Sequence, residues 1–194
     1  SVIGSGTKYP SETTGELEIA GGVFTCPTTF SVGRHNGTSV TAGPEGLSAR
    51  FTVSGGYALV SLLAMGNNYL LLPGYNARPV VEVSGGELEI SNYLNASEHA
   101  GSFSTINVRN TGILRFTGTT DYCARIGLSG AAVLNLSDTA LIHASTDLRL
   151  AYNTEGHGTF NLDGGTLVAR NILRGTGANA FLNFNGGEIG RAHV

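Results

Sequence analysis

Glu155 and His157 lie two residues apart in the segment YNTEGHG from Tyr152, and carboxylate and imidazole groups are common general acids and bases. Hydrolysis of a glycosidic bond by such groups needs two carboxyls about 5 to 9.5 Å apart. Glu155 has no evident partner carboxylate in the neighbouring units of the sequence repeat described below. We therefore expect a surface loop here, and we assign no catalytic residue.

Three histidines, His35, His99 and His157, fall on the same polar segment of the repeat and are the candidates for a metal site. Successive histidines are two repeat units apart, roughly 10 Å if each unit adds one strand spacing. Zinc ligands lie about 2 Å from the metal, so these three side chains are too far apart to share one ion. His143 falls at an apolar position, where we expect a hydrogen-bonded interior residue. We expect no metal and no other cofactor.

Asparagines recur on the same polar segment, at Asn36, Asn76, Asn95, Asn153 and Asn179. Asn tolerates left-handed turn conformations, and stacked Asn side chains form hydrogen-bonded ladders. We expect a structural ladder here, with a glycan-binding or adhesive face as the alternative. The Gly-x-Gly sequences at Gly4 and Gly175 are not followed by a helix, so neither is a phosphate-binding loop.

These residues belong to a repeat whose clearest copy is GTFNLDGGTLVA, Gly158 to Ala169. Apolar and polar residues alternate in it, as in a half-buried strand, and a Gly-Gly pair separates two alternating runs. The other copies with Gly-Gly are LEIAGGVFTC from Leu17, FTVSGGYALV from Phe51, VEVSGGELEI from Val81 and LNFNGGEI from Leu182. INVRNTGILR from Ile106 and LNLSDTALIH from Leu134 lack the pair, and we expect these two units to turn differently.

Aligning the copies gives three columns that are apolar throughout. The first column contains Leu17, Phe51, Val81, Ile106, Leu134, Phe160 and Leu182. The second, two residues on, contains Ile19, Val53, Val83, Val108, Leu136, Leu162 and Phe184. The third, five residues further, contains Phe24, Ala58, Leu88, Ile113, Leu141, Leu167 and Ile189. A fourth column is looser, and a bulge at Arg115 would bring Phe116 inward.

A further short strand follows in most copies, as in FSVG from Phe30, ARIG from Ala124 and LRLA from Leu148, and a polar corner comes after it. Gly and β-branched residues interrupt every candidate helix, and the hydrophobic period is two. Stacked units of about three strands each predict an all-β fold, a single-stranded parallel β-helix of about seven coils. Right-handed winding is favoured by the crossover rule for parallel strands. Residues 1–189 form one domain in this interpretation.

The composition limits the classes of function. The chain has 194 residues, of which 29 are glycine, and only 13% are charged. Its net charge of −3 argues against nucleic acid or an anionic membrane as the main partner, and no apolar run approaches the roughly 20 residues of a membrane span. Cys26 and Cys123 fall three to four coils apart, about 14 to 19 Å, so we expect two free thiols with Cys26 buried.

The units FNLDGGTLVA and LNFNGGEI, with connecting segments such as FSVGRHNGTSVTAG, resemble autotransporter-associated β-strand repeats from Ser1 to about Gly187. The resemblance implies a fragment of a secreted bacterial β-helical surface protein that acts as a structural stalk or adhesin passenger and is not an enzyme. It implies an extracellular or cell-surface location, with an outer-membrane anchor in the full-length protein. The partners that it implies are host or environmental glycans or proteins.

A second resemblance carries the alternative, a carbohydrate-active β-helix enzyme of polygalacturonase or lyase type. Polygalacturonases share the β-helix and carry Gly-His-Gly, present here at Gly156 to Gly158, and Asn153-Thr154-Glu155 resembles their Asn-Thr-Asp. In that family the catalytic carboxylates and the histidine come from successive coils, whereas both fragments lie in one loop here. In addition, no Asp-Asp pair precedes His157 and no Arg-Ile-Lys follows it.

The two ends of the sequence lead to further expectations. The chain has no initiator Met and starts in mid-coil, so we expect a fragment that is truncated at both ends. One choice of codons for EIGRAHV, Glu188 to Val194, resembles a sequencing adapter, and Arg191 stands where intact copies carry an apolar residue. We therefore expect residues 190–194 to be a non-native tail that leaves the strand ladder. Open end coils without a capping helix are expected to fray or to associate end to end.

Overall fold

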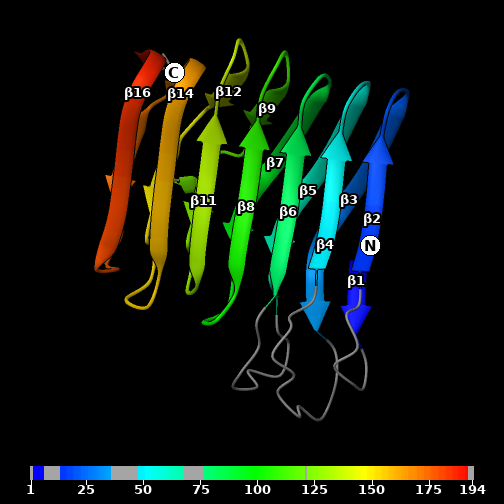
Figure 1. Ribbon diagram of the computed structural model, residues 1–194, viewed down its shortest axis with the longest axis horizontal. Coiled ribbons are helices and arrows are strands. Elements are labelled where there is room, and N and C mark those ends of the chain that lie inside the picture. Colours follow the sequence, from blue (N-terminus) through cyan, green and yellow to red (C-terminus); the bar gives the residue numbers. More distant parts are fainter. Residues whose placement is uncertain (1, 7–13, 36–47, 68–76, 121, 192–194) are drawn as a thin grey trace.

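The computed structural model describes residues 2–6, 14–35, 48–67, 77–120 and 122–191. In these ranges the regular secondary structure is β-strand without a helix, and the strands pair in parallel. Successive strands of the chain pair with strands one coil away, so the chain folds as a parallel β-helix (Figure 1). The predicted fold class is confirmed, while right-handed winding and the count of seven coils stay predictions.

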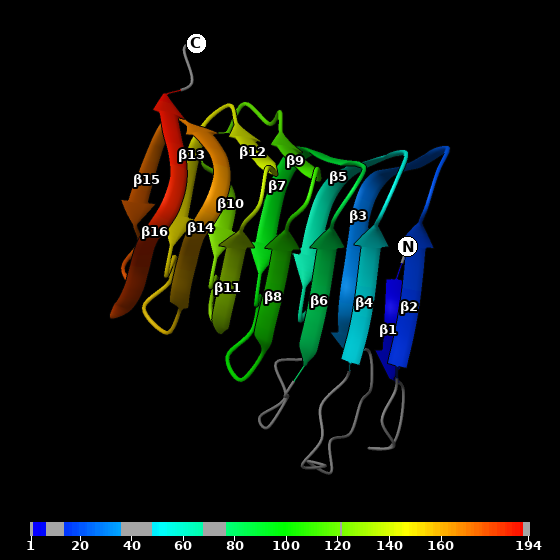
Figure 2. The ribbon, with the colours of Figure 1, turned by 45° about the horizontal axis from the view of Figure 1, so that its top comes forward.

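The strands form three faces. The first face contains β2 (Thr14–Ile19), β4 (Ser48–Val53), β6 (Arg78–Val83), β8 (Phe103–Val108), β11 (Ala131–Leu136) and the first halves of β14 (His157–Ala169) and β16 (Asn179–Arg191). The second contains the first parts of β3 (Val23–His35), β5 (Tyr57–Met65) and β7 (Glu87–Ala96), then β9 (Ile113–Phe116), β12 (Leu141–Ala144) and the second halves of β14 and β16. The third contains β1 (Val2–Gly6), the second parts of β3, β5 and β7, then β10 (Tyr122–Ile126), β13 (Asp147–Leu150) and β15 (Asn171–Arg174). The first face is in front in Figure 1, and Figure 2 shows the other two behind it.

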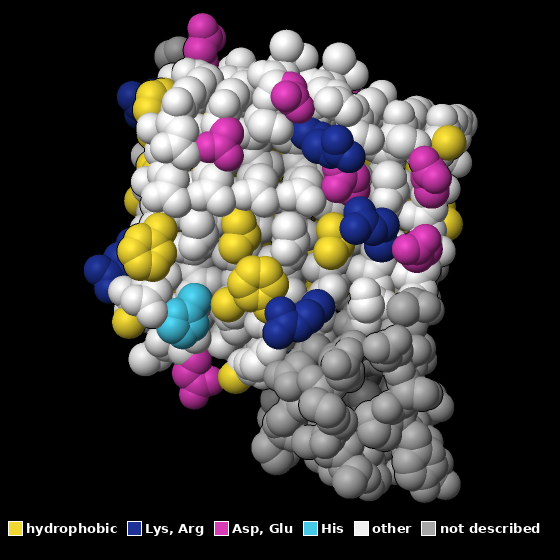
Figure 3. Space-filling model, in the orientation of Figure 1, with side chains coloured by type: hydrophobic (Ala, Val, Ile, Leu, Met, Phe, Trp, Pro, Cys, Tyr) yellow, Lys and Arg dark blue, Asp and Glu magenta, His cyan; other side chains and the backbone are white. Residues whose placement is uncertain are grey.

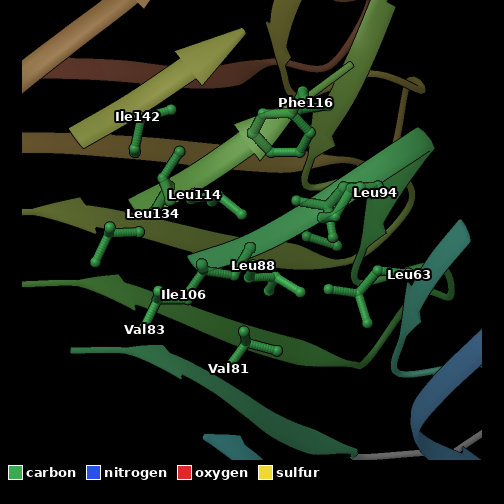
Figure 4. Packing of buried hydrophobic residues seen from close by; sticks show 14 of the residues in the cluster. Leu63, Val81, Val83, Leu88, Leu94, Ile106, Leu114, Phe116, Leu134 and Ile142 are labelled. Atoms are coloured by element: carbon green, nitrogen blue, oxygen red, sulfur yellow. The ribbon is translucent and has the colours of Figure 1, made fainter. Parts of the chain in front are cut away.

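The first column of the repeat forms one stack in register, as predicted, but the expected burial fails at Leu182, which is 44% exposed, and Leu17 is only half-buried. The strand register pairs its members in order: Leu17, Phe51, Val81, Ile106, Leu134, Phe160 and Leu182. The second column follows in the same register from Ile19 to Phe184. Val81, Ile106 and Leu134 point into the interior from successive strands (Figure 4). Each of the three side chains is at most 1% exposed. Burial of each such side chain contributes about 1.5–3 kcal/mol.

The third column predicted from the sequence is wrong in the two units that lack Gly-Gly. Ile113 and Leu141 lie on the outer side of the second face and are only half-buried. The inward column instead contains Phe24, Ala58, Leu88, Leu114, Ile142, Leu167 and Ile189. The bends of these two units have one residue more than the Gly-Gly bends, which shifts the following strand by one position. Phe116 is buried as expected, but the extra residue lies in the bend and not at Arg115.

Each bend contains a residue in the left-handed conformation or a close backbone contact. In the two units without Gly-Gly, Asn110 has φ 56° and Asp138 has φ 60°. Short polar side chains tolerate this region better than other non-glycine residues because they bond to the local backbone. The expectation that these two units turn differently is therefore confirmed.

The Gly-Gly bends lie backbone on backbone. A Cβ on Gly55 would be 2.4 Å from the carbonyl oxygen of Ala20, and a Cβ on Gly85 would be 2.5 Å from that of Ser54. Gly21, in the first described bend, has nothing within 4 Å of its Cβ position. The need for glycine at this position therefore comes from the neighbouring coil.

The last described strand includes two residues of the expected tail. Gly190 pairs with Val168, and Arg191 pairs with Ala169. The expectation that residues 190–194 leave the ladder is thus wrong for these two, and residues 192–194 lie outside the described part. Arg191 is exposed, because β14 is the described pairing partner of β16 and covers one side of it only. The strand therefore continues without burying the charge.

The stacked core predicts a large difference between two phenylalanines. Phe160 has no exposed surface, whereas Phe181 lies on the outer side of β16 and is 56% exposed. We expect Phe160→Ala to lower the free energy of unfolding by roughly 3–5 kcal/mol through the cavity that it leaves. Phe181→Ala, the matched control, should change it by less than about 1 kcal/mol. Urea unfolding followed by circular dichroism measures both, and equal losses would contradict the described stacking.

The stacked bends predict a second matched pair. Gly55→Ala forces the new Cβ against the backbone of Ala20, which cannot move without opening the bend. Overpacking of this kind costs roughly 1–3 kcal/mol of unfolding free energy. Gly21→Ala introduces the same methyl group where the structure has open space, so its unfolding midpoint in urea should stay near that of the parent chain. A midpoint for Gly55→Ala as high as that for Gly21→Ala would show that the bends are not in contact.

Candidate functional site

The loop with Glu155 and His157 joins β13 to β14 at the polar corner, where the third face meets the first. Glu155 is exposed, and Nδ1 of His157 lies 2.8 Å from Nδ2 of Asn179 on the next coil. Backbone hydrogen bonds stack this loop against residues 127–130 on one side and residues 175–177 on the other. Neither segment contains Asp or Glu, so the two stacked segments offer Glu155 no second carboxylate.

The candidate metal ligands lie on one corner of the fold. His35 ends β3, His99 follows β7, and His157 begins β14. The side chain of His35 lies outside the described part of the structure. His99 is half-buried, and this burial lowers its pKa, whereas His157 is exposed beside Asn179. Among the described residues, no group of three or more His, Cys, Asp or Glu side chains is placed to hold a metal ion.

His143 is not the interior residue that the sequence pattern indicated. It pairs with Arg115 and Val168 and lies half-buried on the outer side of the second face, and Ala144 takes the interior position. The reason is the longer bend of this unit, which shifts β12 by one residue. Its Nδ1 atom is buried without a hydrogen-bond partner in the structure.

The corner asparagines do not form the predicted ladder in the part of the chain that the structure describes. Asn95 accepts a hydrogen bond from Arg125 at 2.9 Å. Asn153 donates one to Ser129 at 2.8 Å, and Asn179 contacts His157 at 2.8 Å. Asn36 and Asn76 lie outside the described residues. The three described side chains thus serve separate local contacts.

An asparagine ladder is present on the first face instead. Its members are Asn107, Asn135, Asn161 and Asn183. Each of the last three donates a hydrogen bond to the asparagine of the preceding coil, at 2.7 or 2.8 Å. At the start of the ladder Asn107 donates to Oε2 of Glu82 at 3.2 Å. Sequence reasoning missed this ladder, although an asparagine separates the first and second columns in four consecutive units. Its uncharged amides form part of the pale band across the first face in Figure 3.

The carboxylates of Glu82, Glu87 and Glu89 are held by neighbouring coils. Glu82, only 6% exposed, contacts Arg109 Nε and, at 3.8 Å, Arg50 Nη1. On the second face Glu87 pairs with an arginine at 2.7 Å. Glu89 accepts from the Tyr57 hydroxyl at 2.7 Å, and burial together with this bond raises the pKa of Tyr57 to about 12. These acids bind the coils together and are not free to act on a substrate.

A cluster of arginine and tyrosine side chains lies on the outer side of the third face. We call it the arginine–tyrosine cluster, and it consists of Tyr93 from β7, Tyr122 and Arg125 from β10, Arg149 from β13 and Tyr152 just after β13. Arg125 Cζ lies 4.4 Å from the ring centre of Tyr93 and 5.0 Å from those of Tyr122 and Tyr152. Arg149 Cζ lies 4.6 Å from the Tyr122 ring and 5.8 Å from the Tyr152 ring. All five residues are half-buried.

Two tyrosines of this cluster, Tyr122 and Tyr152, contact each other. The ring centres of Tyr122 and Tyr152 are 5.2 Å apart, and a hydrogen bond with Tyr122, followed by burial, raises the pKa of Tyr152. Sequence reasoning missed the cluster because its tyrosines come from positions without a repeating pattern. The available signal was weaker: Arg125 and Arg149 occupy the same place in ARIG and LRLA.

Both cysteines are buried and free in the structure, as predicted. Burial raises the pKa of Cys123, which keeps the thiol protonated and unreactive. Cys123 is therefore a buried structural residue.

Comparisons with protein-family models, with curated proteins and with solved structures found no match for this chain. The resemblance to autotransporter-associated repeats therefore depends on the repeat residues themselves. The described residues contain no helix that is long and apolar enough to cross a membrane.

Proposed function

We propose that the chain is a structural segment of a secreted bacterial surface protein, a β-helical stalk or adhesin passenger that is anchored at the outer membrane in the full-length protein. The observation that carries this proposal is the unbroken first column, which stays in register from Leu17 to Leu182. Each coil of such a stack contacts only its neighbours, so length can grow by repetition. A fold of this kind is suited to holding a binding surface away from a membrane.

The contacts of the carboxylates support a structural role over the enzymatic alternative. Glu155 has no carboxylate in the two segments stacked on its loop. Glu82, Glu87 and Glu89 are engaged by arginines and hydroxyl groups of adjacent coils. A glycoside hydrolase needs two free carboxyls at a fixed separation, and these side chains do not supply such a pair.

Two measurements test the proposal. Antibodies raised against the chain should label the intact cells that produce it, because the proposed location is outside the outer membrane. The purified chain should release no reducing ends from polygalacturonate, and Glu155→Gln should behave like the parent chain. Labelling that appears only after lysis contradicts the surface location. Release of reducing ends that Glu155→Gln abolishes would establish the enzyme instead.

We also propose that the chain associates end to end through the side of β16 that faces away from β14. Leu182, Phe184 and Ile189 belong to the inward columns but are 44%, 57% and 51% exposed there. Their backbone edge pairs with β14 on one side only among the described strands. An apolar surface beside an unpaired strand edge is a template for another chain.

Sedimentation velocity tests this association. The weight-average sedimentation coefficient of the parent chain should rise with concentration, and Phe184→Asp should reduce that rise because it charges the contact surface. Phe103→Asp is the matched control, since Phe103 is 38% exposed on the outer side of the first face. A concentration-independent coefficient for the parent chain, or an equal effect of both variants, would contradict the proposed surface.

A further inference from the structure

We propose that the arginine–tyrosine cluster is a binding site for an acidic polysaccharide built from uronic acid units. The site lies on the third face, where one member, Tyr152, stands at the start of the loop that carries Glu155. The proposal does not depend on the stalk function proposed above. Three coils contribute to it, through β7, β10 and β13. The ligand class follows from the charge of the site and from its aromatic surface.

The first step concerns the two arginines. Arg125 and Arg149 are direct register partners on neighbouring parallel strands. The backbones of such strands are roughly 4.8 Å apart. Like charges that face each other across two strands destabilise a sheet. Neither guanidinium forms an ion pair in the part of the chain that the structure describes. Within the described residues, the fold thus holds two positive charges side by side without an ion pair to an acid.

Three other arginines of the chain are paired with acids. Arg109 contacts Glu82, Arg115 pairs with Glu87, and Arg170 pairs with an aspartate, each from a neighbouring coil. The pKa of that aspartate, Asp147, is lowered first by its hydrogen bond with Arg170 and least by the charge of Arg149. Its Oδ1 atom accepts from both Arg170 and Asn171, at 2.8 Å each. Asp147 is therefore already engaged by other partners.

The hydrogen-bonding capacity of the two guanidiniums is also largely unused. A guanidinium has five N–H donors. Arg125 makes one side-chain hydrogen bond, from Nη1 to Asn95 Oδ1 at 2.9 Å, and Arg149 makes none in the described structure. The Nε atoms of both arginines are buried without a partner. A carboxylate placed between the two groups would receive donors from both sides and remove their mutual repulsion.

The tyrosines determine the rest of the ligand. Tyr93, Tyr122 and Tyr152 surround the arginines with three rings, each of which has the Arg125 guanidinium over it. The three side chains are only half-buried, so part of their aromatic and hydroxyl surface is accessible to a ligand. Such rings combine a large contact area with a hydrogen-bonding tip. A sugar ring has C–H groups for the flat faces and hydroxyls for the tips, and a uronic acid adds the carboxylate. The surface therefore fits a carboxylated sugar better than a bare anion.

Binding of short oligogalacturonates, measured by titration calorimetry at low salt, tests the proposal. The parent chain should bind them and should not bind neutral galactose oligomers of the same length. Arg149→Gln should weaken binding about tenfold or more, because it removes charge-assisted hydrogen bonds. Arg78→Gln is the matched control: it removes one positive charge from an arginine that lies 5.9 Å over the Phe103 ring on another face. Its affinity should equal that of the parent chain.

The melting temperature is the second readout. It distinguishes a variant that folds but no longer binds the ligand from a variant that does not fold. Arg149→Gln removes the repulsion with Arg125 but also two contacts with tyrosine rings, so its melting temperature without ligand should stay close to that of the parent chain. Oligogalacturonate should raise the melting temperature of the parent chain and of Arg78→Gln, but not that of Arg149→Gln. The proposal is overturned if the parent chain does not bind, or if both variants lose affinity equally. It is also overturned if sulfated dextran binds and oligogalacturonate does not.

Discussion

The fold depends on one constraint: the bend of each coil lies directly against the backbone of the bend before it. A Cβ on Gly112 would lie 2.2 Å from the carbonyl oxygen of Val83, and Ser84 N donates to Val53 O at 2.9 Å at the entrance to another bend. This contact fixes the height of a coil at one strand spacing. Because the spacing is fixed at the bends, each apolar column stays in van der Waals contact along the faces between them.

The parts of the fold that could be predicted are those that follow from alternation. The first and second columns precede the bend in every unit, so period-two patterning is enough to place them. The third column follows the bend, and its position depends on bend length, which the apolar pattern does not determine. Ile113 and Leu114 are both apolar, so hydrophobicity alone could not show which one points inward. The candidate site was less predictable, because Tyr152 reaches it from a loop and Tyr93 from a different coil.

The interior repeats while the outer faces differ. On the first face an uncharged ladder from Asn107 to Asn183 runs across the coils. Near one end of this ladder a buried carboxylate, Glu82, is neutralised by two arginines. On the third face Arg125 and Arg149 are register partners, and their guanidinium groups lie over tyrosine rings. Because outward side chains on the faces lie outside the apolar columns, each face can carry a separate binding surface.

Nuclear Overhauser contacts between assigned methyl groups test the in-register stack most directly. The account predicts that Ile106 contacts both Val81 and Leu134, and that Leu114 contacts both Leu88 and Ile142. Contacts from Ile113 to Leu88 in place of those from Leu114, or an Ile106 without contact to either neighbour in its column, would contradict it.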